Sequence, residues 1–206
     1  MKPDIILFTD ASVENKSPKG SAGCGFIILD VAKGEFKMFS EQVLAHEDKR
    51  ANVAFIELLA MLYGIRRIAK VTTKRSKILV ITDCKCMVDN FSYNMKYRWN
   101  LEQRHYWTDG AGEYITGQKQ MRKIIDICYK KEYKLKIAHI HSHTAHNITI
   151  PRKAVIQIQK DLNHYNVKGK SDIAGLFIQF NRLADLCAKA ATKKYKNQYK
   201  ENRRLR

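Results

Sequence analysis

Two short apolar runs in this chain each end in an aspartate, and this pattern restricts the possible folds more than any other feature. Asp10 follows the run IILFT, and Asp83 follows the run KILVIT. Both runs have the length and the β-branched content of buried strands. Removing an ionised carboxylate from water costs free energy unless a cation or hydrogen-bond donors compensate. If the two strands are parallel neighbours, both aspartates lie at one edge of a sheet, where open α/β sheets place their sites.

The order of the other predicted elements places these strands in an α/β domain. Turn residues separate the strand-like segments 4–11, 25–31 and 35–43, so we expect an antiparallel meander. The later segments alternate between helical and strand character. In order, they are a helix at 52–69, a strand at 77–82, helices at 84–95, 99–108 and 117–131, a strand at 133–143, and helices at 151–165 and 174–195. This order predicts a mixed sheet with helices around it.

Composition narrows the class of partner. With 38 Lys and Arg against 20 Asp and Glu, the formal net charge is +18, which indicates a polyanionic partner such as nucleic acid. A lysine-rich surface that serves solubility alone is the alternative interpretation. The chain has no apolar run of about 18 residues, so we expect no membrane span. Its five cysteines are odd in number and show no Cys-x-x-Cys spacing, which favours free thiols in the cytoplasm.

Two more carboxylates lie in predicted helices. Glu57 is the one charged residue between Ala51 and Ile65, and its helical neighbours are small or apolar, so we expect it on the packed side. A glutamate at the rim, exposed to solvent or paired with Arg50, is the alternative. Asp185, taken alone, fits an ordinary exposed helix residue. Four carboxylates together call for compensating charge, which two Mg²⁺ ions would supply while clamping the oxygens of a phosphodiester.

The segments that carry these carboxylates resemble the ribonuclease H family, type 1, whose members cut the RNA strand of RNA/DNA hybrids. The matching pieces, between about Ile5 and Ala191, are ILFTDASVENKSPKGSAGCGFIIL, NVAFIELLAMLYGI, VITDCKCMVDN, HSHTAH and NRLADLCAKAA. The resemblance implies a ribonuclease H-like five-stranded mixed sheet flanked by helices. We expect a single domain at 1–195 with a helical insertion at about 147–175, which is longer here than in simple bacterial members, and a basic tail at 196–206.

The resemblance also implies roles for individual residues. Asp10, Glu57, Asp83 and Asp185 align with the four metal-binding carboxylates of the family, which use two Mg²⁺ ions, with Mn²⁺ as an alternative. By similarity, Asp10 bridges both ions, and Asp185 helps to hold the ion that activates the attacking water. Glu57 and Asp83 would hold the ion near the leaving 3′ oxygen, so the products are 5′-phosphate and 3′-hydroxyl ends. His143 aligns with a histidine near the metal site and is the remaining catalytic candidate.

Several residues are candidates for substrate contact. They are Ser12, Asn52, Lys96, Arg98, Trp99, Arg104 and Asn181. The segment 93–107 interleaves aromatic and basic residues and resembles the basic protrusion with which many family members grip DNA. Its tryptophans fit a core role equally well. The basic tail would add affinity by counterion release, unless it serves only solubility. The expected partner is an RNA/DNA hybrid bound by a monomer.

Other functions remain open at this stage. A DNA nuclease of the junction-resolvase or integrase type would share the fold, and so would a noncatalytic nucleic-acid-binding module. The presence of all four carboxylates argues against the noncatalytic module. The histidines at 139, 141, 143 and 146 could instead bind zinc, with the first three on one face of the predicted strand. A zinc-type spacing of cysteines or paired histidines is missing from that segment, which argues against zinc.

Overall fold

A computed structural model describes residues 2–14, 21–44, 53–72, 75–89, 117–141, 148–164 and 172–204. Strands and helices alternate after an initial group of three strands, as the sequence predicts. The elements are β1 (Ile5–Glu14), β2 (Ser21–Asp30), β3 (Glu35–Leu44), α1 (Val53–Val71), β4 (Lys77–Thr82), α3 (Gln118–Lys131), β5 (Lys134–His139), α5 (Arg152–His164) and α6 (Ile173–Arg204).

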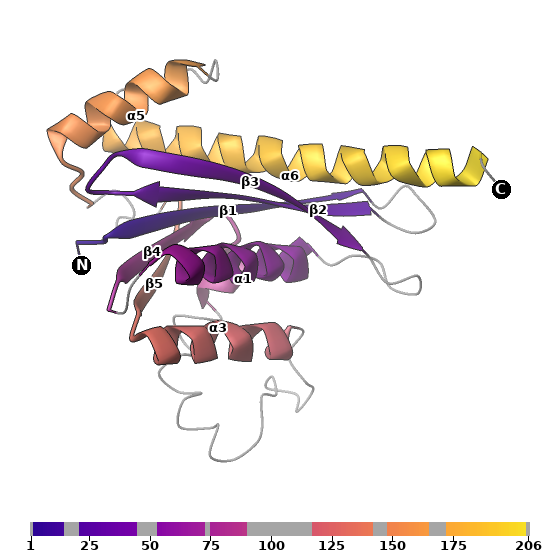
Figure 1. Ribbon diagram of the computed structural model, residues 1–206, viewed down its shortest axis with the longest axis horizontal. Coiled ribbons are helices and arrows are strands. Elements are labelled where there is room, and N and C mark those ends of the chain that lie inside the picture. Colours follow the sequence, from indigo (N-terminus) through magenta and orange to yellow (C-terminus); the bar gives the residue numbers. More distant parts are fainter. Residues whose placement is uncertain are drawn as a thin grey trace, which may run out of the picture.

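The strands form one five-stranded mixed sheet in the order β3-β2-β1-β4-β5 (Figure 1). The first three strands are antiparallel, and β4 and β5 join as parallel strands. This arrangement confirms the predicted combination of a meander with parallel strands. In the register of β1 and β4, Phe8 pairs with Ile81. Asp10 and Asp83 each lie two residues further along, so they stand level just beyond the end of β4, whereas β1 continues to Glu14.

Helices cover both faces of the sheet, because successive strand residues point to opposite sides. On one face, Ile6 and Phe8 of β1 pack against α6, where the rings of Phe8 and Phe180 stack at 4.8 Å between centroids. On the other face, Leu7 packs in a cluster with residues of α1 and α3, such as Met61 and Ile124. Figure 1 shows α6 above the sheet and α1 with α3 below it. The two clusters hold β1, and therefore Asp10, from both sides.

Two glycines let α6 lie directly on β2. A Cβ atom on Gly25 would lie 1.9 Å from the carbonyl oxygen of Ala184, and one on Gly23 would lie 2.4 Å from that of Ala188. No larger residue fits at either position without moving the helix. Because Gly25 pairs with Asp10 and Ala184 precedes Asp185, this close approach brings Asp185 level with Asp10.

Four predicted element ends differ from the structure by three residues or more. Strand β1 ends at Glu14 and not at 11, and β2 begins at Ser21 and not at 25. The strand predicted at 133–143 ends at His139, because its partner β4 ends at Thr82, the residue that pairs with His139. The last helix does not end at 195 but continues to Arg204, so most of the predicted tail at 196–206 is helical. This part of α6 contains no glycine or proline and many good helix formers, including lysine and glutamine.

Other predictions are met in part. Helix α5 lies within the predicted helical insertion at 147–175, one residue after Pro151. Residues 85–89 are helical, in agreement with the start of the helix predicted at 84–95. The rest of that helix and all of the helix predicted at 99–108 lie outside the described residues. That residues 1–195 form a single domain stays a prediction.

Candidate active site

Three carboxylates from three different elements meet at the carboxyl edge of the sheet. One carboxylate oxygen from each of Asp10, Glu57 and Asp83 lies within 4.8 Å of the other two. Asp10 comes from β1, Glu57 from the second turn of α1, and Asp83 from the residue after β4. Asp10 and Glu57 are buried, whereas Asp83 is exposed to solvent. The group is therefore anchored in the core and open on one side.

The side chain of Glu57 is almost completely buried, which is stable for a carboxylate only beside a compensating charge or hydrogen-bond donor. Its exposed fraction is 2%, so the alternative of a glutamate at the rim is wrong; Arg50 lies outside the described residues. Burial, and then the charges of Asp10 and Asp83, raises the pKa of Glu57 well above its ordinary value of 4.5. Its Oε2 atom has no hydrogen-bond partner within the described part of the chain. A buried oxygen of this kind costs free energy until a cation or donor meets it.

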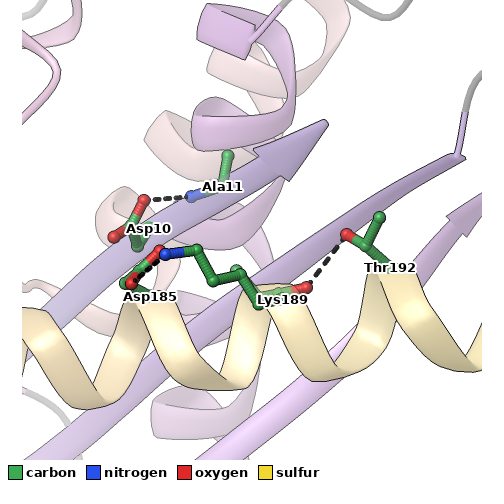
Figure 2. A network of polar contacts seen from close by, with 6 residues as sticks. Asp10, Ala11, Asp185, Lys189 and Thr192 are labelled. Carbon is green, nitrogen blue, oxygen red and sulfur yellow. Dashed lines mark hydrogen bonds and ion pairs between the residues drawn. The ribbon is translucent and has the colours of Figure 1, made fainter. Parts of the chain in front are cut away.

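Asp10 lies at the centre of the same group, with an exposed fraction of 7%. Burial, followed by the charge of Asp83, raises the pKa of Asp10 from 3.8 to about 7, and Asp185 adds to the effect. The backbone N–H of Ala11 donates to Oδ1 at 2.7 Å and opposes the rise (Figure 2). The contact between the two carboxyl groups lowers the pKa of Asp10 and raises that of Glu57. Without a cation, these two groups retain protons that ordinary carboxylates lose.

Asp185 faces this group from α6 but already has a cationic partner. Figure 2 shows its carboxylate beside Asp10, with the side chain of Lys189 reaching back to it from the next helical turn. The distance from Lys189 Nζ to Asp185 Oδ2 is 2.7 Å. Asp185 is not part of the group of three that lies within 4.8 Å. The sequence analysis missed Lys189, although the spacing of four residues on one helix could have indicated the pair.

The donor set fits a hard divalent cation. Every candidate ligand atom is a carboxylate oxygen, the type that Mg²⁺, Mn²⁺ and Ca²⁺ prefer. The orphaned Glu57 Oε2 is a further sign that a positive partner belongs there. Among the described residues, no histidine belongs to a group of three or more candidate metal ligands. The zinc alternative loses its shared strand face, because β5 ends at His139, whereas His143 and His146 lie outside the described residues.

Two of the predicted substrate contacts lie on the same elements as site carboxylates, within one helical turn or two strand residues of them. Ser12 is on β1, two residues after Asp10, and its carbonyl oxygen accepts a hydrogen bond from Thr192 Oγ1 at 3.1 Å. Asn181 is on α6, one turn before Asp185, and its Oδ1 atom is buried with no partner among the described residues. Six other predicted site residues lie outside the described residues and stay predictions. They are Asn52, Lys96, Arg98, Trp99, Arg104 and His143.

The residues after Asp83 add groups that the sequence analysis did not assign to the site. The sulfur atoms of Cys84 and Cys86 are 3.0 Å apart, and His139 Nε2 lies 3.1 Å from the carbonyl oxygen of Asp83. All five cysteines are free thiols, as predicted. The His139 contact ties the end of β5 to the end of β4, so it helps to fix the backbone that carries Asp83.

The metal-free protein should lose stability as the pH rises from about 4 to about 7. The folded-state pKa of Asp10, about 7, exceeds the ordinary 3.8, so folding is favoured while Asp10 holds its proton and the advantage is lost through this range. We expect urea unfolding in EDTA to show a fall of about 2–4 kcal/mol between pH 5 and pH 8, since one pKa unit is worth about 1.4 kcal/mol. The Asp10→Asn variant should show a clearly smaller fall. Equal falls in the two proteins would contradict the assigned pKa.

Comparisons with known proteins agree with this geometry. The RNase H family model matches residues 2–193. No helix in the described part of the chain combines the length and apolar character needed to cross a membrane. Comparison with curated proteins gives no match.

Solved structures share the fold at low sequence identity. A foamy viral protease-reverse transcriptase in complex with dsDNA matches with a TM-score of 0.59 and 14% identity, over 92% of this chain and 94% of that chain. RNase H1 from the halophilic archaeon Halobacterium salinarum NRC-1 gives 0.51 and 12%, over 92% and 98%. LC11-RNase H1, isolated from compost and solved in complex with an RNA/DNA hybrid, gives 0.51 and 18%, over 93% and 98%.

These findings confirm the resemblance stated from the sequence. The family match spans nearly the whole chain, the sheet has the predicted five strands with an antiparallel meander and parallel pairs, and three of the four aligned carboxylates meet beside the end of β4. From this agreement we conclude that the chain belongs to the RNase H family and is a ribonuclease H enzyme.

Proposed function

We propose that this enzyme is an endonuclease that hydrolyses the RNA strand of RNA/DNA hybrids with two Mg²⁺ ions, and leaves 5′-phosphate and 3′-hydroxyl ends. One observation carries the proposal: Asp10, Glu57 and Asp83 bring their oxygens within 4.8 Å of one another on the fold of this family. LC11-RNase H1, a structural neighbour, was solved with a hybrid bound, which supports this substrate. Mn²⁺ is the alternative ion, since it accepts the same oxygen ligands.

The residues of the chain would prepare the site before substrate arrives. Asp10, Glu57, Asp83 and Asp185 would hold the ions, which when bound would neutralise charge and lower the pKa of the attacking water. The packing of α1 holds Glu57 in place, and the Ala11 N–H orients Asp10. Such a rigid arrangement needs little reorganisation during the reaction.

The charge of the chain supports a nucleic-acid substrate. A carboxylate group repels phosphates unless cations reverse the local field, and the net charge of +18 supplies a strongly positive background. Ser12 and Asn181 flank the carboxylates, so both are proposed to contact the substrate near the cleaved bond. Recognition of the RNA strand would depend on its 2′-hydroxyl groups and on the shape of the minor groove. We further propose a monomer that acts in the cytoplasm, which the five free thiols support.

A panel of four substrates tests the proposed activity against the alternatives. Labelled hybrid, duplex RNA, duplex DNA and a four-way junction are each incubated with the protein in Mg²⁺ and in EDTA. We expect cleavage of the hybrid in Mg²⁺ alone, within its RNA strand. Preferred cleavage of the junction would instead indicate a DNA resolvase. Tight binding with no cleavage of any substrate would indicate a noncatalytic module.

Replacement of His143 by alanine should slow turnover by roughly ten- to a thousandfold, the usual range for a group that moves a proton. The expected reason is proton handling at the attacking water or at the departing product, a role that holds no metal. The variant should therefore retain its Mg²⁺ requirement and its affinity for hybrid in single-turnover and binding assays.

The neighbouring histidines supply the controls for that prediction. His141→Ala should keep most of the activity, and His139→Ala, which loses the contact with the Asp83 carbonyl oxygen, should lose less than His143→Ala. If His141→Ala is inactive and His143→Ala is near normal, the alignment of this segment is wrong by two residues. If all three variants lose their structure and regain it with zinc, the histidines form a structural site.

A further inference from the structure

Five basic residues of α6 follow one side of the helix, beginning one turn after Asp185. Lys189 stands one turn after Asp185, and Lys193 stands one turn further, with both lysines exposed. The sequence of α6 continues this spacing of three or four residues at Lys196, Lys200 and Arg203. At 3.6 residues per turn, all five positions and Asp185 fall within an arc of about 80°. We call positions 189, 193, 196, 200 and 203 the basic stripe.

The base of the basic stripe is fixed to the sheet. Thr192 Oγ1 donates to the carbonyl oxygen of Ser12 at 3.1 Å, and Ser40 Oγ donates to that of Cys187 at 2.7 Å. The contacts of Gly23 and Gly25 with the α6 backbone add to this anchor. The C-terminal part of α6 extends past the ends of β1 and β2 (Figure 1). The anchor therefore sets the direction in which this side of the helix faces.

The opposite side of the same helix segment has no matching row of cations, because it carries one lysine and one glutamate. Lys194 falls about 140° from the centre of the basic stripe, and Glu201, the one acidic residue after Asp185, falls about 120° from it. A chain that needed positive charge only for solubility would gain nothing from this ordering. The phase that places the cations in line with Asp185 is the feature that calls for a partner.

We propose that the basic stripe binds the sugar-phosphate backbone of the nucleic acid as it leaves the active site. The inference rests on the proposed function, because the substrate is placed at the carboxylates by that function. From Lys189 to Arg203 the stripe rises about 21 Å, at 1.5 Å per residue. A duplex rises about 3.4 Å per base pair, so the stripe can follow about six base pairs beyond the cleaved bond. The extension of α6 is then a substrate-binding element of the enzyme.

Removing charge from the stripe should weaken binding in a way that depends on helical position. In an Asp10→Asn background, which prevents cleavage, Lys193, Lys196 and Lys200 are replaced by glutamine, a residue with similar helix propensity. We expect hybrid affinity at about 0.1 M salt to fall by roughly two orders of magnitude. The slope of log K against log salt should fall by about 2 to 3, at about 0.9 for each lost contact. Fluorescence anisotropy over a salt series gives both quantities.

A matched control removes the same charge elsewhere. Lys153, Lys160 and Lys194 are exposed, and none is in the stripe, so their replacement by glutamine should change the affinity by less than about threefold. Equal losses in the two triple variants would overturn the proposal. An unchanged salt slope in the stripe variant would overturn it as well.

A second variant keeps every charge and changes the angular position of most of the basic stripe around the helix axis. One alanine inserted between Thr192 and Lys193 rotates the rest of α6 by about 100°. We expect this protein, checked by circular dichroism for its helix content, to bind hybrid almost as weakly as the triple stripe variant. Binding as tight as in the parent would mean that α6 attracts nucleic acid without a defined contact, and the proposal would be wrong.

The outcomes separate this proposal from the proposed function. If the protein cleaves no hybrid, yet the stripe variants bind nucleic acid poorly and the control binds well, the proposed activity is wrong and the proposed role of the basic stripe is supported. If wild-type protein cleaves hybrid and the stripe variants bind it normally, the proposed activity is supported and the proposed role of the basic stripe is wrong.

Discussion

Replacement of Asp10 by asparagine should reduce cleavage of an RNA/DNA hybrid by more than roughly a hundredfold, which corresponds to about 2.7 kcal/mol of lost transition-state stabilisation. Asparagine keeps the shape of the side chain but removes the charge at the centre of the carboxylate group. The substrate contacts proposed for the stripe and for Ser12 are untouched, so hybrid binding in Ca²⁺ should survive. Single-turnover kinetics and anisotropy measure the two effects separately.

The surface residue Asp126 supplies a matched control for that substitution. It is an exposed aspartate on α3, and Asp126→Asn should leave cleavage within about twofold of wild type. The Asp10→Asn protein should also be more stable than wild type in EDTA at pH 8, because it removes one of several crowded carboxylates. If Asp10→Asn retains more than a few per cent of wild-type turnover, with contaminating nuclease excluded, Asp10 does not have its assigned role.

Replacement of Gly25 by alanine should cost about 3 kcal/mol of stability, at the upper end of the usual effect of overpacking. The added Cβ would lie 1.9 Å from the Ala184 carbonyl oxygen, a backbone atom that moves only if α6 moves. Urea unfolding at pH 7 measures the loss. Because Asp185 directly follows Ala184, the shift of α6 should also reduce cleavage in protein that remains folded.

A conservative change at Ser40, which lies on β3 beside Gly25 and also contacts α6, serves as the comparison. Ser40→Ala removes a single hydrogen bond to the Cys187 carbonyl oxygen and should cost only about 1 kcal/mol. If Gly25→Ala is no less stable than Ser40→Ala, helix α6 does not lie against β2 as closely as the structure has it.

The carboxylate group was largely predictable because its causes are local. The apolar runs before Asp10 and Asp83 predict two strands, and parallel pairing then brings the two aspartates level with each other. Glu57 was predictable as a buried residue because helical periodicity places it among apolar neighbours. Asp185 could not be assigned to the site in this way, because the residues around it fit an ordinary surface helix. Only the family resemblance assigned it to the site, and its position depends on two distant glycines.

The errors came from features that depend on other parts of the chain. The end of β5 is set by the end of β4, and no local signal near His139 marks it. The sequence prediction ends the last helix at 195 and assigns residues 196–206 to a basic tail, but charge does not end a helix whose residues have good helix propensity. Lys189 was missed because the aspartate was considered without its neighbour one turn away.

A hybrid with different fluorophores on its RNA and DNA strands gives the decisive measurement. The enzyme is mixed with the hybrid in Mg²⁺, then EDTA is added in excess, and Mg²⁺ is finally restored, while the lengths of both strands are followed on denaturing gels. We expect the RNA strand alone to shorten, to stop shortening in EDTA and to resume when Mg²⁺ returns. Cleavage that continues in EDTA, or cleavage of the DNA strand, would contradict a carboxylate-held metal site that cuts RNA in hybrids.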